Sequence, residues 1–267
     1  MIRIGFVGCG HIGGVHSYAL KRLATAGLID AAVTATFDIE PERARRFARH
    51  HGAEPASSLE ELVDAVDAVW VCTWTAGHLD VVECAADKAR AIFCEKPLAP
   101  TLADCERVAA ALEQVPHQVG LVLRYAPVFT ILAERIASGD YGKPLATVFR
   151  DDQYFPIQGM YGSTWRKDVE AAGGGTLIEH SIHDVDILRW LLGDPVAVSA
   201  RTTSRFGHAG IDDVAALMFS YADGSVAQLT SVWHQVLTRE SSRRLEVFCE
   251  EGYFWTDDDY LGPLHVQ

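Results

Sequence analysis

A short stretch of the sequence, from Gly173 to Trp190, combines residues that are typical of proton transfer. It reads GGGTLIEHSIHDVDILRW and holds one glutamate, two histidines and two aspartates within eight consecutive positions. The residues after the three glycines are predicted to form a helix, on which Glu179, His183 and Asp186 share one face at spacings i, i+4 and i+7. Histidine exchanges a proton near neutral pH, so this face is a candidate for acid–base chemistry.

Other interpretations of this face compete with proton transfer. A metal site would use His180 and His183, whose i, i+3 spacing occurs with zinc, but it needs a distant third ligand, for which only His234 suggests itself. A polar helix could also pack against a partner domain, whereas a solvated face would favour Lys–Glu pairs and this stretch has no lysine. We favour proton transfer without a metal, with His183 as the base in alcohol oxidation and the acid in reduction. Glu179 would orient the substrate or the imidazole, and Asp186 would fix the helix or the histidine.

Lys96 is a second candidate for chemistry. It follows the apolar run AIFC (residues 91–94) and stands between Glu95 and Pro97. The carboxyl end of a strand in a parallel sheet is where ligands bind, and this position favours a role in a site over that of an ordinary surface lysine. We expect the Lys96 ammonium to hydrogen-bond the reacting oxygen and to stabilise the negative charge that develops on it.

A dinucleotide-binding motif lies at the start of the chain. Residues 8–13, GCGHIG, fit the pattern G-x-G-x-x-G, and they follow an apolar strand-like run and open a helical one, as the motif requires. The glycines permit a tight turn and let a pyrophosphate approach the helix N-terminus. Asp38 comes 25 residues after Gly13, near the place of a carboxylate that binds the adenosine ribose and repels a 2′-phosphate. NAD is therefore favoured, while the nearby Arg43 leaves NADP open.

The secondary structure predicted to position these groups differs between the first and the second half of the chain. Up to residue 123, strand-like runs alternate with helical segments, which predicts a doubly wound parallel sheet. The predicted strands are 2–8, 31–38, 67–73, 91–94 and 118–123, and the predicted helices are 11–26, 41–51, 78–87 and 101–114. From Arg124 on, a helix over 126–138 precedes strand-like runs at 144–152, 196–202, 213–221, 225–234, 243–251 and 252–258, with a hairpin turn at Asp223-Gly224. We therefore predict an α/β protein with a dinucleotide-binding domain over 1–123 and an α+β domain with an open, mostly antiparallel sheet over 124–267.

The composition limits the classes of partner that the protein is expected to bind and the cellular compartment in which it is expected to act. The chain has 267 residues, of which 49% are hydrophobic and 22% charged, and this suits a globular protein of one or two domains. A net charge of −13 argues against nucleic-acid and anionic membrane partners. The six cysteines form no CxxC pair, the N-terminus does not resemble a signal peptide, and no apolar run approaches the roughly 20 residues of a membrane span. These features predict a cytoplasmic protein with a small-molecule substrate.

Several motifs, taken in order, resemble the glucose–fructose oxidoreductase / inositol dehydrogenase / MocA family. The matching pieces are VGCGHIG, FDIEPERARRFA, CTWTAGH, CEKPLAPT, GKP near Gly142 and GGGTLIEHSIHDVDILRWLLGDP, which together span residues from about 2 to 195. The resemblance implies a Rossmann domain, a second α/β domain with an open antiparallel sheet, and NAD or NADP. It also implies oxidation of a sugar, a cyclic polyol or a similar hydroxyl compound, or reduction of its ketone.

The resemblance also assigns site residues. The lysine of the family's E-K-P motif falls on Lys96, the catalytic carboxylate and histidine fall on Glu179 and His183, and a further family aspartate falls on Asp186. The residues expected to bind the cofactor are Gly8, Gly10, His11, Ile12, Gly13, Asp38, Thr73, His78, Glu95 and Lys96. The residues expected to bind a polyhydroxy substrate, because aromatic and guanidinium groups suit it, are Arg124, Tyr154, Trp165, Arg166 and His180.

The chain also departs from the family pattern. Glu179 stands where the family usually has aspartate, Ser181 replaces a glycine, and Trp74 replaces a proline, which could shift the carboxylate and reshape the nicotinamide pocket. The chain ends soon after Trp255, before the segments that normally complete the second domain, so we expect either a truncated or a shortened domain.

Two rival functions and one assembly state follow from the same sequence. The chain could reduce a non-sugar cyclic carbonyl compound on the same scaffold, or it could be a non-catalytic dinucleotide-binding sensor or regulator. The presence of both Lys96 and His183 favours the enzyme, since a sensor would need neither. Because long open sheets are usually covered, we also expect a homodimer or homotetramer that forms through the C-terminal sheet.

Overall fold

The computed structural model of the protein describes residues 1–257 and 262–267. The chain divides into two compact units, Met1–Gly120 and Leu121–Gln267, and each is described by itself. The strand predicted over 252–258 ends with Asp258, which lies outside the described residues.

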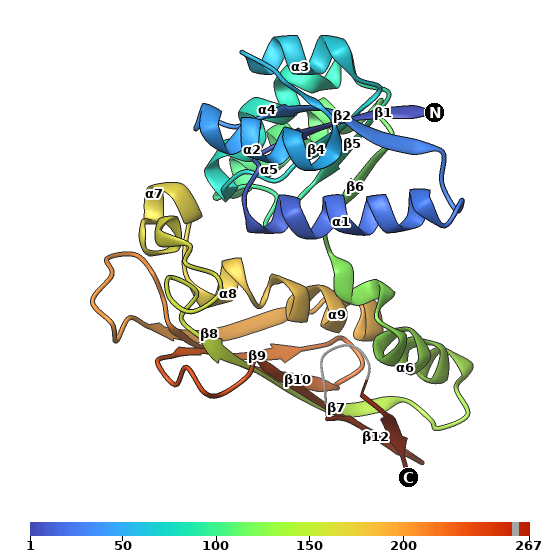
Figure 1. Cartoon of the computed structure of the whole chain (residues 1–267). Helices are drawn as coiled ribbons and strands as arrows, with labels where there is room; N and C mark the ends of the chain where they lie inside the picture. The colour runs from blue at the N-terminus through green and yellow to red at the C-terminus, as the bar shows by residue number, and fades with distance from the viewer. Residues whose placement is uncertain (258–261) are drawn as a thin grey trace. The chain divides into compact units, whose positions relative to one another are not determined.

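The first unit is built on a six-stranded, all-parallel sheet with the order β3-β2-β1-β4-β5-β6 (Figure 1). Its strands are β1 (Ile2–Val7), β2 (Ala31–Phe37), β3 (Glu54–Pro55), β4 (Ala68–Val71), β5 (Ala91–Cys94) and β6 (His117–Val119). Its α-helices are α1 (His11–Thr25), α2 (Pro41–His51), α3 (Leu59–Ala65), α4 (His78–Ala86) and α5 (Leu102–Leu112). The order reverses between β1 and β4, so the predicted doubly wound sheet is confirmed, with the ligand-binding edge expected at the carboxyl ends of these strands.

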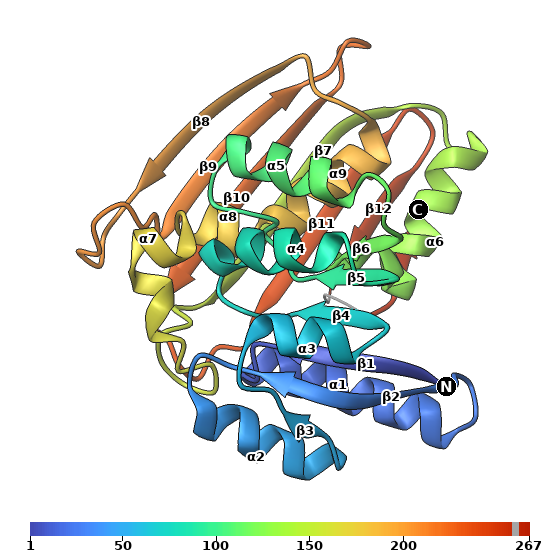
Figure 2. The same cartoon turned by 90° about the horizontal axis from the view of Figure 1, so that it is seen from above.

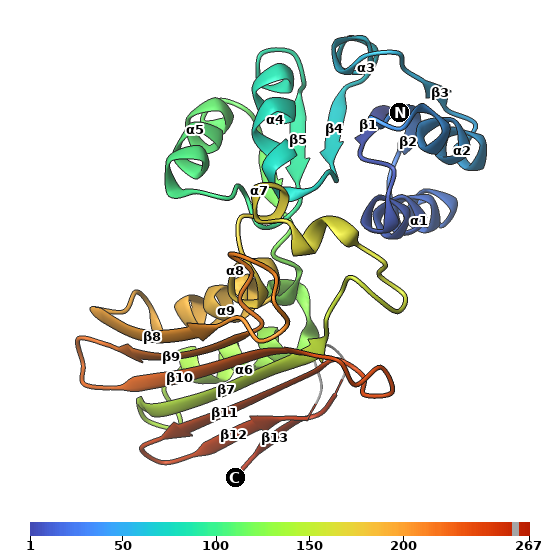
Figure 3. The same ribbon diagram turned by 90° about the vertical axis from the view of Figure 1, so that its left-hand side faces the viewer.

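Helices lie on both faces of this sheet (Figure 3), and their apolar residues form a hydrophobic layer on each face. Apolar residues of α3, α4 and α5, such as Leu62, Val82 and Val108, pack on one face. Phe47 of α2 packs with Phe6 of β1 on the other face, beside apolar residues of α1. Because both faces are covered, the central strands are near-continuous apolar runs, which is why their sequence pattern was recognisable.

Local signals set the helix ends in this unit. Pro41 begins α2, and Gly52 ends it in the left-handed conformation at φ 66°. Thr101 caps α5 by accepting a hydrogen bond from the Asp104 N–H. The sequence analysis missed β3 and α3, and it made β6 too long, because a short 3₁₀ helix over Val122–Tyr125 follows that strand.

The second unit contains a seven-stranded sheet with the order β13-β12-β11-β7-β10-β9-β8 (Figure 2). Its strands are β7 (Pro144–Tyr154), β8 (Ala197–Thr203), β9 (Val214–Ser220), β10 (Val226–His234), β11 (Ser242–Cys249), β12 (Tyr253–Thr256) and β13 (Leu264–Val266). Its α-helices are α6 (Pro127–Ser138), α7 (Val169–Ala172), α8 (Thr176–Glu179) and α9 (Ile182–Leu192). All pairs are antiparallel except β7 with β10, so the prediction of a mostly antiparallel sheet is confirmed.

One face of this sheet packs against helices, and the hairpin turn at Gly224 joins β9 and β10 as predicted. Phe149, Leu229 and Leu245 point into the core, where Phe129 of α6 and Ile187 of α9 meet them. Among the described residues of this unit, no helix covers the opposite face (Figure 3). That open face carries the alternate residues of each strand, in agreement with the period of two.

The prediction of one continuous helix after Gly173 is wrong. Gly173 ends α7 in the left-handed conformation at φ 81°, and the following segment is split into α8 and α9 by a link at His180 and Ser181. The physical reason lies in competing hydrogen bonds from neighbouring strands. The Ser181 hydroxyl donates to Asp151 on β7 at 3.2 Å, and such side-chain bonds offer the chain an alternative to a regular helix.

Candidate functional site

A cleft of about 260 Å³ lies at the carboxyl ends of β1, β2 and β4 in the first unit. Its lining includes Gly8 and Gly10 of the motif, Asp38 after β2, and Thr73 and Trp74 after β4. This is the edge at which a doubly wound sheet binds ligands, and the residues come from the loops that the sequence analysis had singled out. The cleft is therefore the candidate cofactor site.

The three glycines of the motif lack a side chain for different structural reasons. A Cβ atom on Gly8, where φ is +90°, would lie 2.5 Å from the carbonyl carbon of Cys72, and one on Gly13 would lie 2.6 Å from the Gly8 oxygen. These two positions are fixed by the protein's own packing. At Gly10 no described atom lies within 4 Å of the Cβ position, so the space beside it is open. Gly10 precedes the first turn of α1, where helix N–H groups favour an anion, and this space fits a dinucleotide pyrophosphate.

Asp38 is held by the backbone on both of its oxygens. The Cys9 N–H donates to Oδ2 at 2.9 Å, and the Glu40 N–H donates to Oδ1 at 2.9 Å. Arg43 lies 3.7 Å from Oδ1 of Asp38 and donates to Glu40 at 2.7 Å, so two carboxylates already balance its charge. A carboxylate fixed at this corner suits a ribose diol and repels a 2′-phosphate.

His78 connects two loops at the edge of the sheet. It is 1% exposed, its Nδ1 lies 2.8 Å from the Pro97 oxygen, and its Nε2 lies 3.3 Å from the Thr73 oxygen. Burial lowers the pKa of His78, which favours the neutral ring. The structure therefore places His78 behind the cleft, where it holds the Thr73 and Pro97 segments. Trp74 adopts φ −70°, an angle that a proline at this position would also adopt.

Lys96 follows β5 and belongs to a fixed turn. The Glu95 carboxylate accepts a hydrogen bond from the Lys96 N–H at 3.1 Å, and its other oxygen lies 2.6 Å from His16 Nε2 on α1. A Cβ on Gly120 would lie 3.0 Å from Glu95 Oε1, so the absence of a side chain there makes room for the carboxylate. The Lys96–Pro97 peptide bond is cis. The sequence analysis missed His16, because nothing in a helical pattern distinguishes it from a surface histidine.

In the second unit, Glu179 lies at the end of α8 and is 2% exposed. Its Oε2 accepts a hydrogen bond from Arg166 Nε at 3.3 Å. The Arg166 guanidinium also lies 4.3 Å from the centre of the Trp165 ring, in cation–π geometry. The structure thus brings together a predicted catalytic carboxylate and two predicted substrate-binding residues.

His183 and Asp186 lie on α9, beyond the break, so Glu179 does not share their helix. His183 is 7% exposed. Asp186 accepts two hydrogen bonds from Arg124, both at 2.7 Å, and this bidentate pair fixes the start of the unit to α9. Arg124 also lies 5.7 Å from the centre of the Trp190 ring.

The remaining two substrate candidates have partners of their own. The Tyr154 hydroxyl accepts a hydrogen bond from the Met160 N–H at 3.4 Å, in the loop that follows β7. His180 Nε2 lies 3.0 Å from Asp151 and 3.2 Å from Arg243. The sequence analysis missed Asp151 and Arg243, although each occupies an inward position of an alternating strand. A charged residue at such a position is the signal that could have found them.

Over 1–257 and 262–267, no group of three or more histidine, cysteine, aspartate or glutamate side chains is placed to hold a metal ion. In the same ranges, no helix combines the length and the apolar character that a membrane crossing requires.

Comparison with known proteins identifies both units. A family model described as an oxidoreductase family with an NAD-binding Rossmann fold matches residues 2–122. A second model, described as the GFO/IDH/MocA C-terminal domain, matches residues 129–255.

Similar proteins extend over nearly the whole chain. The inositol 2-dehydrogenase of Rhizobium meliloti (strain 1021) is 32% identical over 265 residues, which cover 94% of this chain and 74% of the relative. The myo-inositol 2-dehydrogenase of Thermotoga maritima is 29% identical over 269 residues, which cover 96% of this chain and 75% of the relative. The crystal structure of GenD2 from gentamicin A biosynthesis, in complex with NAD, superposes with a TM-score of 0.85 at 26% identity, covering 96% of this chain and 72% of that one.

Proposed function

Because the chain belongs to the Gfo/Idh/MocA family of oxidoreductases with an NAD-binding Rossmann fold, we propose that it oxidises a hydroxyl group of a sugar, an inositol or a related polyol, or reduces the corresponding ketone. The observation that carries this proposal is the buried pair of candidate groups in the second unit, Glu179 and His183, on either side of a helix break. Relatives named inositol 2-dehydrogenase support the substrate class.

The residues proposed to bind the cofactor line the cleft of the first unit or hold the segments that line it. We assign the pyrophosphate to the open space beside Gly10 at the first turn of α1, with His11 and Ile12 as the first helical residues there and Gly8 and Gly13 shaping the turn. Asp38 is assigned to the adenosine ribose and Thr73 to the wall of the cleft. Glu95 and His78 act on the cofactor through the segments that they hold. NAD, when bound, exchanges the hydride with the substrate carbon.

The acid–base groups supply the proton chemistry. His183 takes the hydroxyl proton in oxidation and returns it in reduction, since imidazole suits both roles near neutral pH. Lys96 hydrogen-bonds the reacting oxygen, and its charge stabilises the negative charge that develops on that oxygen. Glu179, held by Arg166, orients the substrate or the imidazole.

The substrate-binding candidates divide by their partners. Tyr154, Trp165 and Arg166 are assigned to the polyhydroxy substrate, because aromatic and guanidinium groups suit sugar faces and hydroxyl groups. Arg124 and His180 are held by Asp186 and Asp151, carboxylates that have no proposed contact with substrate, so we assign them to positioning. The partner of Arg166 is Glu179, which is itself proposed to orient the substrate or the imidazole. We also propose that the protein acts in a reducing cytoplasm, since all six cysteines have free thiols.

A substrate panel tests the proposed function. The protein is mixed with NAD or NADP and with inositols, aldoses, sugar acids and non-sugar cyclic alcohols, and nicotinamide absorbance is followed. We expect turnover with at least one inositol or sugar. Turnover of the non-sugar compounds alone would favour the rival substrate class, and tight NADH binding without any turnover would favour a sensor.

Substitution of Asp38 tests its assignment to the adenosine ribose of the cofactor. Replacing Asp38 by alanine removes a charged acceptor, and losing such a hydrogen bond costs about 1.5–3 kcal/mol, so NADH affinity is expected to fall about 10- to 100-fold. NADPH affinity should fall less, because the repulsion of the 2′-phosphate is also removed. Fluorescence titration measures both, with Asp87→Ala on the C-terminal side of α4 as the control. Equal losses for the two cofactors would contradict the assignment.

The open face of the second sheet is proposed to bind a second copy of the chain. Apolar side chains gather on it, including Val148 (37% exposed), Met218 (44%) and Phe248 (42%), and the rings of Phe248 and Tyr253 lie 4.7 Å apart. Such a patch is usually covered. We expect a dimer or tetramer in sedimentation, and dissociation in Phe248→Glu but not in Leu102→Glu, which places the same charge on an exposed leucine of the first unit. A monomeric wild-type protein would refute this.

A further inference from the structure

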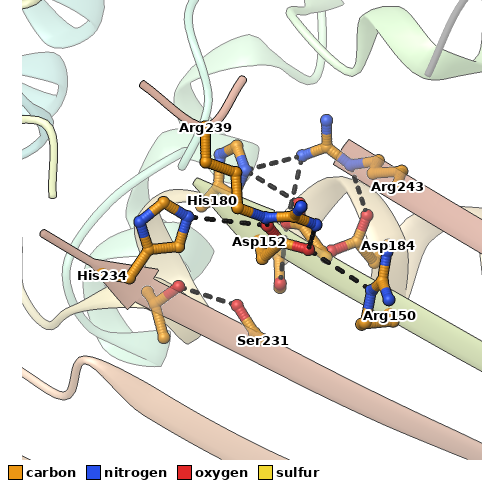
Figure 4. A network of polar contacts seen from close by, with 11 residues as sticks. Arg150, Asp152, His180, Asp184, Ser231, His234, Arg239 and Arg243 are labelled. Carbon is orange, nitrogen blue, oxygen red and sulfur yellow. Dashed lines mark hydrogen bonds and ion pairs between the residues drawn. The ribbon is translucent and has the colours of Figure 1, made fainter. Parts of the chain in front are cut away.

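Four ionisable side chains lie together beneath the α8–α9 link in the second unit. They are Asp151 of β7, His180 of the link, Asp184 of α9 and Arg243 of β11, which form one network of contacts. Figure 4 shows Arg243 between His180 and Asp184, with a dashed line to each. Asp151 and Asp184 are both 0% exposed, and Arg243 is 2% exposed. Burying several ionisable groups is costly unless they compensate one another. The proposed hydride and proton transfers do not use this cluster.

Arg243 joins the two carboxyl groups of the cluster. Its Nε donates to Asp184 Oδ1 at 2.8 Å, and its Nη2 donates to Asp151 Oδ2 at 3.2 Å. Arg243 and Asp151 are directly paired in the β11–β7 register, so the sheet itself sets this contact. If both carboxyl groups were ionised, one guanidinium would face two negative charges in the interior, which is unfavourable. A proton on one of them restores the balance.

His180 is the other group of the cluster that can hold this proton. Its Nε2 lies 3.0 Å from Asp151 Oδ1 and 3.2 Å from Arg243 Nη2. A ring nitrogen that carries hydrogen donates to a carboxylate, whereas one that does not carry it accepts from a guanidinium, and a single nitrogen cannot do both. A neutral ring can meet either partner through one of its two tautomers, whereas a protonated ring donates to Asp151 and its charge offsets one of the two carboxylates. His180 and the carboxyl pair are therefore alternative places for the same proton.

The pKa of Asp184 agrees with this geometry. Burial and the neighbouring charge of Asp151 raise the pKa of Asp184 to about 7, against the opposing effect of Arg243. The other charged groups nearby have separate partners. Asp152, on the opposite face of β7, contacts Arg150, Arg239 and His234, and Glu179 pairs with Arg166.

The cluster holds the link at three points. His180 and the Ser181 hydroxyl both contact Asp151, and Asp184 in the first turn of α9 contacts Arg243. Glu179 directly precedes the first of these residues, and His183 directly precedes the last. Whatever fixes the link therefore fixes the directions in which Glu179 and His183 leave the backbone.

We propose that Asp151, Asp184 and His180 share one proton, and that the cluster in this protonated state positions Glu179 and His183 for catalysis. The second half rests on the proposed function. When the proton leaves for solvent, two carboxylates face one guanidinium, and the link loosens. The four members are positioning residues, because they act through the link and not on substrate.

The shared proton is tested without any assay of activity. Carboxyl ¹³C NMR of the wild-type protein follows the aspartate signals with pH, and Asp184→Asn identifies the signal of Asp184. We expect this signal to titrate near pH 7, the pKa of Asp184 being about 7. In Asp151→Asn its midpoint should fall by about one pH unit or more, since a neighbouring charge is removed. The control Asp194→Asn, at an exposed aspartate, should leave it unchanged. A wild-type midpoint below about 5, together with a His180 ring whose ¹⁵N signals show it neutral over the same pH range, would overturn the proposal, because no group of the cluster would then hold the proton.

The positioning role has its own readouts. The Nε–H signal of Arg166, which donates to Glu179, should shift with the same midpoint as Asp184 in the wild type and not in Asp184→Asn. The ratio of kcat in Asp184→Asn to kcat in wild type should rise about threefold or more from pH 6 to pH 8, because the amide stays neutral where the carboxyl ionises. A wild-type Arg166 signal that does not move would overturn the positioning role, even if the protein turned over no substrate.

Discussion

Replacing His183 or Lys96 by alanine is expected to lower kcat about 10²- to 10⁴-fold, the range that positioned acid–base groups and charge-stabilising donors supply. The two losses have different causes. Without His183 the hydroxyl proton has no base, and without Lys96 the negative charge on the reacting oxygen is not stabilised. Steady-state kinetics on the substrate found in the panel measures both effects.

Control substitutions of a lysine and a histidine outside the proposed site show whether the loss of kcat is specific to His183 and Lys96. Lys88→Ala removes an exposed lysine of the first unit that pairs with Asp64, and His265→Ala removes a histidine of the second unit that pairs with Asp257. Both controls should keep kcat within about twofold, because surface ion pairs contribute little. A kcat that survives in either His183→Ala or Lys96→Ala would contradict the role assigned to that residue, provided that thermal unfolding shows a folded protein.

Substitution of two motif glycines is expected to have two different effects, loss of stability at Gly8 and loss of cofactor affinity at Gly10. Gly8→Ala is expected to destabilise the protein by about 3 kcal/mol or more, because a side chain at φ +90° is strained and its Cβ would lie 2.5 Å from the Cys72 carbonyl carbon. Gly10→Ala should change the free energy of unfolding by less than about 1 kcal/mol, since no described atom lies within 4 Å of its Cβ. It should nevertheless weaken NADH binding by about tenfold or more, because the methyl group occupies the space that a pyrophosphate needs.

Denaturant unfolding and NADH titration separate these effects. The assignment of the cleft requires opposite patterns in the two variants, with lost stability in Gly8→Ala and lost affinity in Gly10→Ala. Full NADH affinity in a folded Gly10→Ala protein would place the pyrophosphate elsewhere.

Much of the fold was predictable because local signals and burial agreed. Apolar runs that end in glycine or aspartate, such as residues 2–8 and 31–38, mark strands buried on both faces. Pro41 and Gly52 mark the ends of α2 through their own backbone preferences. The strand β3 could not be predicted, since it has only two residues, and its place in the sheet depends on pairing with β2 rather than on its own pattern.

Candidate site residues could be named from the sequence, whereas the contacts between them could not. The motifs indicated the glycines, Lys96, Glu179 and His183, and membership of the family they predicted is now confirmed. The break at His180 could not be predicted, because it depends on Asp151 of a strand that lies 29 residues earlier in the chain. Arg243 is 63 residues from His180, and it reaches the cluster because the register of β11 with β7 pairs it with Asp151. The only trace of such a long-range polar contact in the local sequence is a charged residue at a strand position where an apolar residue is expected.

Transfer of deuterium tests the central claim most directly. The protein is incubated with NAD and, in separate reactions, with an inositol or sugar of the panel that carries deuterium on its carbon atoms, and the reduced nicotinamide from the compound that is turned over is analysed by mass spectrometry. We predict that the nicotinamide acquires the deuterium, and that His183→Ala and Lys96→Ala lose this transfer while the Lys88→Ala and His265→Ala controls keep it. If inositol and the sugars of the panel all fail to label the nicotinamide in the wild-type protein, although NADH binds in the cleft, the protein is not the polyol dehydrogenase proposed here.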